Sequence, residues 1–423
     1  MNADMLRTAV GLNWAGTYQY QAAGIAHAES IPEVQRLVAD ADRIRTLGTR
    51  HSFNDLADTT GTLVTVTSIP ADVELDPTAR TVTVGAGTRY GVLADFLEER
   101  GWALHNMGSL PHISVGGAIS TGTHGSGNRN GNLSTAVRAL TFVGPDGDLR
   151  TVRKGDPDFG GSVIALGALG VLVRVTLAIE PSYLVRQDVY RGLHWNELLP
   201  NLLAVTASGY SVSIFTDWVS EDSHVWVKQR VDSVDVMPAP DLFGATLDHP
   251  SSPPLTDALD SNLTEFGIAG PWAHRLPHFR LDATPSVGSE IQTEYFVDLD
   301  IAAAALQALR PLGGQMKPHL VGTELRTTAA DELWLSPAHR QPVLGIHFTW
   351  HNHPDAVAKL LPQIEQALVL YGGRTHWGKL HHQTAGSLIP LYERIDDMWD
   401  LIARTDPGGK FTNDHLDRVL RPR

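Results

Sequence analysis

The spacing of hydrophobic residues changes part of the way along the chain. In the first 183 residues, short stretches of alternating polarity mix with stretches in which apolar residues recur every three or four positions. Alternation is typical of strands, and the longer period is typical of helices. Helices are predicted over residues 29–43 and 90–99, strands over 44–47, 62–67 and 170–179, and hairpins over 73–84 and 139–152.

After about residue 183 the alternating stretches become longer. Strands are predicted over residues 209–215, 224–229, 290–298, 320–327 and 343–350, and helices over 302–312, 356–370 and 390–404. Long alternating strands with helices between them are typical of an antiparallel α+β domain. The Pro-, Ser- and Asp-rich stretch 238–254 is predicted to be a long surface loop.

Composition limits the class of protein. At about 150 residues per domain, 423 residues predict two or three domains. The net charge of −14 argues against a nucleic-acid partner, which needs a positive surface. The absence of cysteine excludes disulfides, thiolate metal sites and cysteine nucleophiles. Neither a signal peptide nor an apolar run of membrane-spanning length is recognisable, so a cytoplasmic protein with no membrane partner is predicted.

Two segments of small polar residues are candidates for ligand binding. Residues 46–55 (TLGTRHSFND) can form an anion-binding nest, although an ordinary polar turn is the more common interpretation of such a short segment. Residues 108–127 are dominated by glycine and small hydroxyl residues, which lets a flat or phosphorylated ligand approach the backbone closely. Neither a Walker nor a Rossmann glycine pattern is present there, and a flexible loop is the alternative.

The later strands carry a third candidate. Because side chains alternate along a strand, residues 322, 324 and 326 share one face, as do 345, 347 and 349, and as do 292 and 294. These faces hold His, Gln, Glu and Arg, whereas the opposite face of residues 344–350 is apolar. On the pattern alone, a binding face and an ordinary solvated face are equally supported.

Other chemistry is less well supported. His351 and His353, and the pair His381 and His382, have spacings seen among metal ligands, but they lack acidic or cysteine partners at fixed intervals. No metal site is therefore predicted. The chain has no Gly-x-Ser-x-Gly motif, so a hydrolase would lack its nucleophile.

Together and in this order, the three segments resemble those of the vanillyl-alcohol-oxidase-type FAD-linked oxidases, and among them the bacterial alditol oxidases. The resemblance covers nearly the whole chain and includes 167–171, 324–326, 347–349 and 376–379. It implies an α+β fold, with a two-part FAD-binding domain and a substrate (cap) domain built on an antiparallel sheet with flanking helices. The implied boundaries are 1–183 for the FAD-binding domain, 184–375 for the cap, and 376–423 for a C-terminal segment that returns to the first domain.

The resemblance also implies the cofactor and its contacts. FAD is expected, bonded covalently through a ring nitrogen of His51. Further cofactor contacts are implied for Thr46, Leu47, Gly48, Thr49, Arg50, Ser52, Asn54, Ser109, Ser114, Gly116, Gly117, Ala118, Thr121, Gly122, Thr123, His124, Gly125, Gly170, Val173, His376, Lys379 and Asn413. The protein is expected to act as a monomer.

The implied reaction is the oxidation of a linear polyol such as xylitol or sorbitol. The terminal primary alcohol would become the aldose as hydride passes to flavin N5, and O2 would be reduced to hydrogen peroxide. Implied substrate contacts are Ser109, Gln292, Glu324, Arg326, His347, Thr349 and Lys379. Ser109, Glu324, Arg326 and Lys379 are the implied catalytic residues, with Arg326 and Lys379 stabilising negative charge.

Two alternatives remain open. Sugar-lactone oxidases and dehydrogenases share the Glu-x-Arg and His-Trp-x-Lys elements, so a lactone-oxidising flavoprotein is the nearest one. By analogy with the family, the small Gly108 before Ser109 leaves space for O2 and favours an oxidase. A non-enzymatic FAD- or carbohydrate-binding module is the third possibility, which the charged Arg326 and Lys379 make less attractive.

Overall fold

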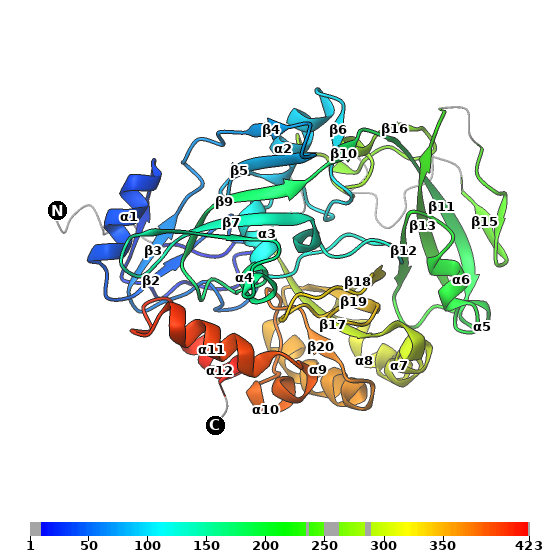
Figure 1. Ribbon diagram of the computed structural model, residues 1–423. Coiled ribbons are helices and arrows are strands. Elements are labelled where there is room, and N and C mark those ends of the chain that lie inside the picture. The colour runs from blue at the N-terminus through cyan, green and yellow to red at the C-terminus, as the bar shows by residue number, and fades with distance from the viewer. Residues whose placement is uncertain (1–9, 234–236, 249–261, 284–288, 422–423) are drawn as a thin grey trace.

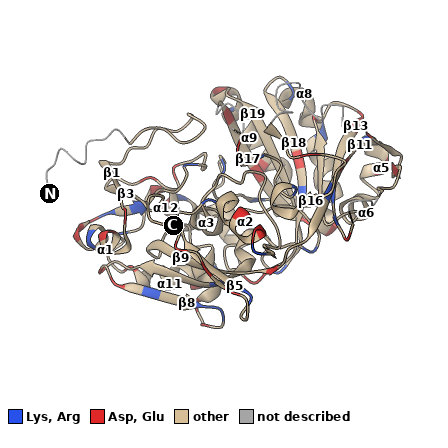
Figure 2. Cartoon of the chain, turned by 90° about the horizontal axis from the view of Figure 1, so that it is seen from above, with Lys and Arg blue, Asp and Glu red and all other residues tan. Residues whose placement is uncertain are grey.

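The computed structural model describes residues 10–233, 237–248, 262–283 and 289–421 of the chain. Figure 1 shows an N-terminal part, coloured from blue to the green of β9, beside a second part that contains the largest sheet. Acidic and basic residues are interspersed over both parts (Figure 2). Within the described ranges, no helix combines the length and the apolar character needed to cross a membrane.

The first part is built on two sheets. One is parallel with the order β1-β3-β2, and the other is antiparallel with the order β4-β5-β9-β7-β8. Their strands are β1 (Gly24–His27), β2 (Ile44–Thr46), β3 (Thr62–Thr65), β4 (Glu74–Asp76), β5 (Thr81–Gly85), β7 (Val137–Val143), β8 (Leu149–Arg153) and β9 (Val171–Ala178). The helices of this part are α1 (Ile31–Asp40), α2 (Tyr90–Glu98), α3 (Val115–Ser120) and α4 (Phe159–Val163).

The second part is built on a ten-stranded antiparallel sheet. Its order is β14-β15-β11-β13-β12-β18-β19-β17-β20, with β16 also paired to β11. The strands are β11 (Leu184–His194), β12 (Ser211–Thr216), β13 (Asp222–Val231), β14 (Asp241–Leu242), β15 (Ala245–Leu247), β16 (Gly270–Pro271), β17 (Glu290–Asp298), β18 (Leu320–Thr328), β19 (Val343–His351) and β20 (Arg374–Thr375). The helices are α5 (Trp195–Leu198), α6 (Leu202–Thr206), α7 (Ala302–Leu309), α8 (Gly313–Met316) and α9 (Pro354–Leu368).

The predicted α+β fold is confirmed, and so are the two predicted hairpins, which form as β4–β5 and β7–β8. The predicted long strands also form, as β12, β13, β17, β18 and β19. On β19 the apolar residues Leu344, Ile346, Phe348 and Trp350 are buried in one core with residues of α7 and α9. The two-residue period therefore specified which face of this strand packs against helices.

One local prediction was wrong. Residues 241–247, expected in a loop, form the hairpin β14–β15, and this hairpin pairs with β11. Phe243 and Gly244 both have positive φ, 51° and 86°, as a tight two-residue turn requires. Residues 249–254 of the expected loop lie outside the described residues. The flexible-loop alternative for residues 108–127 is not what the structure shows at residues 115–120, which form helix α3, because burial of Val115, Ala118 and Ile119 outweighs the low helix propensity of the adjacent glycines.

Two large hydrophobic cores divide the molecule. One lies in the first part and also includes residues of the C-terminal segment, while the other lies entirely between residues 190 and 368. Trp272 and Leu335 come from the middle of the chain but belong to the first core. We propose the division at residues 183 and 375 on this basis, with two loops of the middle segment packed on the first part.

The C-terminal segment carries α10 (Ala385–Leu388), α11 (Ile395–Thr405) and α12 (Asp414–Leu420), with α11 and α12 coloured red in Figure 1. Asn413 begins α12, and its side-chain oxygen accepts from the N–H of Leu416 at 3.0 Å. Its amide nitrogen lies 3.0 Å from the carbonyl oxygen of Leu56 and 2.8 Å from that of Asp58. One buried side chain thus caps a helix and holds the loop that follows residue 55.

We expect Asn413→Ala to lower the free energy of unfolding by about 2 kcal/mol, because it removes a helix cap and leaves buried carbonyls unpaired. Denaturation in urea, followed by tryptophan fluorescence, measures this change. Asn201→Ala is the matched control, since Asn201 precedes α6 but makes no capping hydrogen bond. A loss of stability no larger than that of the control would contradict the role given to Asn413.

Candidate active site

A cavity of ≈ 590 Å³ has residues of the segments 46–55 and 108–127 on one side and the polar face of β17, β18 and β19 on the other. Its volume lies in the range of small-molecule and cofactor sites. The segment 108–127 is held against the sheet by backbone hydrogen bonding, since Gly127 pairs with Thr328 at the end of β18. Segments that are far apart in sequence therefore form opposite walls of one site.

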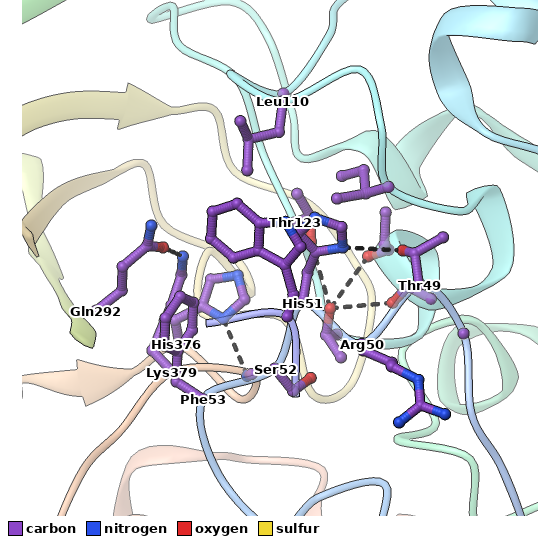
Figure 3. Close-up of a pocket in the computed structure, with 18 of the residues that line it drawn as sticks. Thr49, Arg50, His51, Ser52, Phe53, Leu110, Thr123, Gln292, His376 and Lys379 are labelled. Atoms are coloured by element: carbon purple, nitrogen blue, oxygen red, sulfur yellow. Dashed lines mark hydrogen bonds between the residues drawn. The ribbon is translucent and has the colours of Figure 1, made fainter. Parts of the chain in front are cut away.

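His51 lies on the loop after β2, on one wall of the cavity (Figure 3). Its Nδ1 lies 3.1 Å from the hydroxyl of Thr49, and its ring stacks on Trp14 at 5.0 Å between centroids. Its Nε2 is buried without a hydrogen-bond partner among the described residues. Burial, followed by the charge of Lys379, lowers the pKa of His51 to about 4, so the imidazole is neutral at pH 7.

The floor of the cavity is backbone. Ser114 precedes α3, and its N–H donates to the hydroxyl of Thr49 at 3.2 Å. A Cβ atom at Gly48 would lie 2.8 Å from Ser114 Oγ, and one at Gly117 would lie 2.9 Å from the same atom. Both distances are too short for a side chain unless Ser114 moves, so glycine at these positions lets the two segments meet closely.

A buried arginine stands at the other end of the cavity. Arg45 on β2 donates to the carbonyl oxygens of Leu56, Leu166 and Phe411, and so joins three separate segments. Its Nε has no hydrogen-bond partner among the described residues. Burial lowers the pKa of Arg45 to about 10, which leaves it charged. This end of the cavity is otherwise lined by small and apolar residues, among them Ala57, Ala165, Gly167 and Gly170.

The polar faces of the three strands are aligned by the sheet register. His347 on β19 lies directly between Glu324 on β18 and Glu294 on β17. Gly322, Thr349 and Gln292 form the next row. Glu294 is 1% exposed, and Glu324 and Gln292 are each 7% exposed, so the solvated-face alternative is wrong. These side chains line the cavity instead.

Arg326 is the central charge of this face. Its guanidinium lies 3.2 Å from Glu294 Oε1, 3.6 Å from Glu324 Oε2 and 3.2 Å from the hydroxyl of Ser109. Glu294 Oε1 also lies 2.9 Å from His124 Nε2. Burial opposes ionisation of Glu294, but His124 and Arg326 hold its pKa well below the usual range. The site thus keeps an ionised carboxylate beside the arginine.

A second cation approaches from the C-terminal segment. The ammonium of Lys379 donates to Gln292 Oε1, and Figure 3 shows the two side chains pointing toward one another. Burial lowers the pKa of Lys379 to about 8. Burial and the charge of Lys379 lower the pKa of His347 to about 3, so His347 is neutral at pH 7. The face therefore combines two fixed cations with neutral groups able to hydrogen-bond.

Most of the predicted site residues come together. The cavity is lined by Thr46, Leu47, Gly48, Thr49, Arg50, His51, Ser52, Ser109, Ser114, Gly116, Gly117, Ala118, Thr121, Thr123, His124, Gly170, Gln292, Glu324, Arg326, His347, Thr349, His376 and Lys379. No group of three or more His, Asp or Glu residues suited to a metal occurs in the part of the chain that the structure describes.

Five residues predicted to contact the cofactor do not line the cavity. Asn54 donates to the carbonyl oxygens of Trp377 and Lys379, and Asn413 caps α12. Val173 is buried in the first hydrophobic core. Gly122 lies against Ile164 and Pro337, and Gly125 lies against Met107 and Asn106. These residues shape the walls through packing and backbone hydrogen bonds.

Several cavity residues were missed. Trp14 and Arg45 stand in segments without a recognised motif, and His278 lies in an irregular segment between strands. No local pattern distinguishes these three residues. Glu294 could have been included, because alternation places it on the same face as Gln292.

The cavity fits the FAD that the resemblance implies. The unpartnered Nε2 of His51 leaves one ring nitrogen without a hydrogen bond. A side chain at Gly48 or Gly117 would collide with Ser114 Oγ, so glycine there lets the two segments meet closely, and the cavity has both polar and apolar lining residues. A long cofactor with a polar middle and two flat ends matches this division.

Comparison with known proteins gives the same result. Residues 22–153 match a family model described as an FAD binding domain, and residues 284–419 match one described as D-arabinono-1,4-lactone oxidase. The chain is 40% identical over 413 residues to alditol oxidase of Streptomyces sp. (strain IKD472 / FERM P-14339), covering 96% of this chain and 98% of that protein. It is 28% identical to L-gulono-1,4-lactone dehydrogenase of Mycobacterium tuberculosis, covering 97% and 99%.

The fold has solved counterparts. The crystal structure of cholesterol oxidase from B. sterolicum superposes with a TM-score of 0.79 and covers 98% of this chain and 97% of that one. Sequence identity in this superposition is 16%, so the likeness concerns the fold alone.

Proposed function

Because the chain belongs to the vanillyl-alcohol-oxidase-type family of FAD-linked oxidases, we propose that it oxidises linear polyols such as xylitol and sorbitol. The terminal primary alcohol is the reacting group, the aldose is the product, and O2 is reduced to hydrogen peroxide. The buried row of hydrogen-bonding side chains across β17, β18 and β19 is the observation that carries this proposal. Such a row suits a chain of hydroxyl groups, because its members would stay unpaired with an apolar substrate.

The cofactor would be held by the segments 46–55 and 108–127. Gly48, Ser114 and Gly117 let the two segments approach each other closely, and the apolar end beside Arg45 would hold the adenosine. We propose that His51 carries the covalent link, because its neutral ring has an unpartnered Nε2 and is held in place by Trp14. When bound, FAD takes a hydride from the alcohol carbon and passes the electrons to O2.

The charged residues act on the reacting oxygen. Arg326 and Lys379 stabilise the negative charge that develops there, from positions that are fixed before the reaction. Ser109 and Glu324 hold substrate hydroxyl groups, and His347, Thr349 and Gln292 extend this contact along the sheet. Glu294 lies 3.2 Å from the guanidinium of Arg326 and offsets part of the cost of burying that charge.

A sugar-1,4-lactone oxidase or dehydrogenase is the second candidate, favoured by the lactone-oxidase family model and by the 28% identical dehydrogenase. Gly108 distinguishes the classes of acceptor. A Cβ atom there would lie 3.6 Å or more from its neighbours, so glycine leaves space beside Ser109. A screen of polyols and lactones, with peroxide detection and stopped-flow reoxidation of the flavin by O2, separates the two candidates.

For the covalent link, we expect acid-precipitated protein to stay yellow and precipitated His51→Ala to be colourless, because only the wild type keeps its flavin after denaturation. The absorbance of the redissolved pellets measures this. His376→Ala is the matched control, since His376 lines the same cavity and its pellet should stay yellow. Colour retained in the His51→Ala pellet would place the link elsewhere.

For Arg326 and Glu324, we expect different kinetic effects. Arg326→Ala should lower kcat by about 100-fold or more, since it removes a preorganised cation that acts in the transition state. Glu324→Gln should mainly raise KM, by about tenfold for a five-carbon polyol and less for a three-carbon one. Steady-state kinetics on both polyols provide the test.

The control for these two variants is an exposed pair. Arg340 and Glu332 form a surface ion pair, so Arg340→Ala and Glu332→Gln should leave both constants unchanged. Near-normal kcat in flavin-loaded Arg326→Ala would remove Arg326 from the reaction.

For Lys379, we expect kcat/KM to fall as the pH rises through about 8, because deprotonation removes the positive charge from a group whose pKa burial has lowered. Lys379→Arg should keep its charge and shift the fall to higher pH. Lys379→Met should be slow at every pH and lack this limb of the profile. A wild-type limb that persists in Lys379→Met would assign the titration to another group.

A further inference from the structure

A buried lysine lies behind the polar face. Lys228 on β13 is 1% exposed, and within the described residues it has no carboxylate at ion-pair distance. Its ammonium donates instead to the carbonyl oxygens of Leu276 and Pro277 and lies 3.1 Å from His278 Nδ1. His278 lines the cavity, and its Nε2 lies 2.7 Å from Glu324 Oε1. The imidazole of His278 therefore lies between Lys228 and Glu324 of the polar face and contacts both.

The positions of the hydrogens follow from these contacts. Burial lowers the pKa of Lys228 to about 7, but its surroundings suit the ammonium form, because two carbonyl oxygens and His278 Nδ1 supply one acceptor for each of three hydrogens. An ammonium has no lone pair, so Nδ1 of His278 accepts from this form of Lys228. The ring hydrogen of a neutral His278 is then on Nε2, where it is donated to Glu324. Burial and the charge of Lys228 lower the pKa of His278 to about 4, which agrees with a neutral ring.

The ring has little freedom to turn away. It packs edge-on against Trp226 at 5.0 Å between centroids and lies 6.2 Å from the ring of Phe215. The backbone of the same segment is also fixed, because the N–H groups of His278 and Phe279 both donate to the carbonyl oxygen of Ser109, at 3.1 and 3.2 Å. One irregular segment therefore contacts both Ser109 and Glu324.

The consequence concerns the two oxygens of Glu324. Oε1 is occupied by His278, whereas Oε2 lies 3.6 Å from Arg326 Nε and 3.9 Å from His347 Nδ1. Both distances are longer than ordinary hydrogen bonds. Among the described residues, Oε2 therefore keeps its acceptor capacity for a ligand in the cavity.

We infer that His278 and Lys228 are positioning residues for substrate specificity. Lys228 selects one tautomer of His278, and His278 then holds Glu324 as an ionised acceptor with one oxygen free for a substrate hydroxyl. This inference rests on the proposed oxidation of polyols and extends it to residues that do not touch the reacting carbon. It predicts an effect on the binding of hydroxyl-bearing substrates and little effect on the chemical step.

The test compares three variants of the flavin-loaded, full-length protein. His278→Leu removes the donor to Glu324 and should raise KM for a five-carbon polyol by about tenfold or more, while kcat changes less than about threefold. His278→Gln should restore KM toward the wild-type value, because its amide can accept from Lys228 and donate to Glu324. Lys228→Met should raise KM, since the tautomer is no longer selected.

The control is another histidine of the same region. His274 is paired with Asp95 at the surface, so His274→Leu should leave both constants unchanged. A KM in His278→Leu equal to that of the wild type would overturn the inference. So would an equal rise in the Leu and Gln variants, since that would mean packing and not hydrogen bonding is responsible.

A second measurement is independent of turnover. In NMR spectra of protein labelled with ¹⁵N-histidine, the signal of His278 is identified as the one lost in His278→Gln. Its chemical shifts should indicate a neutral ring with its hydrogen on Nε2, and Lys228→Met should change those shifts. A hydrogen on Nδ1, or a cationic ring, would overturn the inference even if KM responds. A wild type that oxidises no polyol would overturn the proposed function and the substrate role of the pair, while this signal would still decide the tautomer.

Discussion

The pairing of buried charge around Arg326 is the constraint on which the rest of the site depends. The side chain of Arg326 is 8% exposed, and its charge must be paired because an isolated buried charge costs several kcal/mol. The two carboxylates are those of Glu294 on β17 and of Glu324, which lies on the same strand as Arg326. The register of β17, β18 and β19 brings them together, so a shift of one residue would separate the charges and expose the apolar face.

This polar face is covered by the first part of the chain together with the segment around His278. Gly127 pairs with Thr328, and Ser109 is held by the backbone of residues 278 and 279. The covering segments are rich in glycine and small polar residues, so they approach closely without filling the space between the walls. A cavity remains, polar along the sheet and apolar beyond it.

Such a cavity suits a reaction in which a cofactor supplies the redox chemistry and the protein supplies position and charge. The cations do not have to be recruited during the reaction, since Gln292, Glu294 and Ser109 already orient them. For the proposed polyol substrates, specificity would have a separate basis, because it would depend on atoms such as Glu324 Oε2 and His347 Nε2, which have no hydrogen-bond partner among the described residues. The segment around His278 contacts both Ser109, which lies beside Arg326, and Glu324.

The sequence alone determined the local elements and the residue types of the site. Alternation assigned the faces of residues 292–294, 322–326 and 345–349, and the glycine-rich segments together with these faces indicated the family. Only the tertiary structure decided which face is buried, because burial depends on what packs on a strand from elsewhere. For the same reason, only the structure showed that Asn413, expected to contact the cofactor, caps a helix. It also showed that Trp14, Lys228 and His278 lie at or next to the site. The two-residue period shows only on which side of a strand a side chain lies. These contacts join segments separated by dozens to hundreds of residues, and no local pattern carries that information.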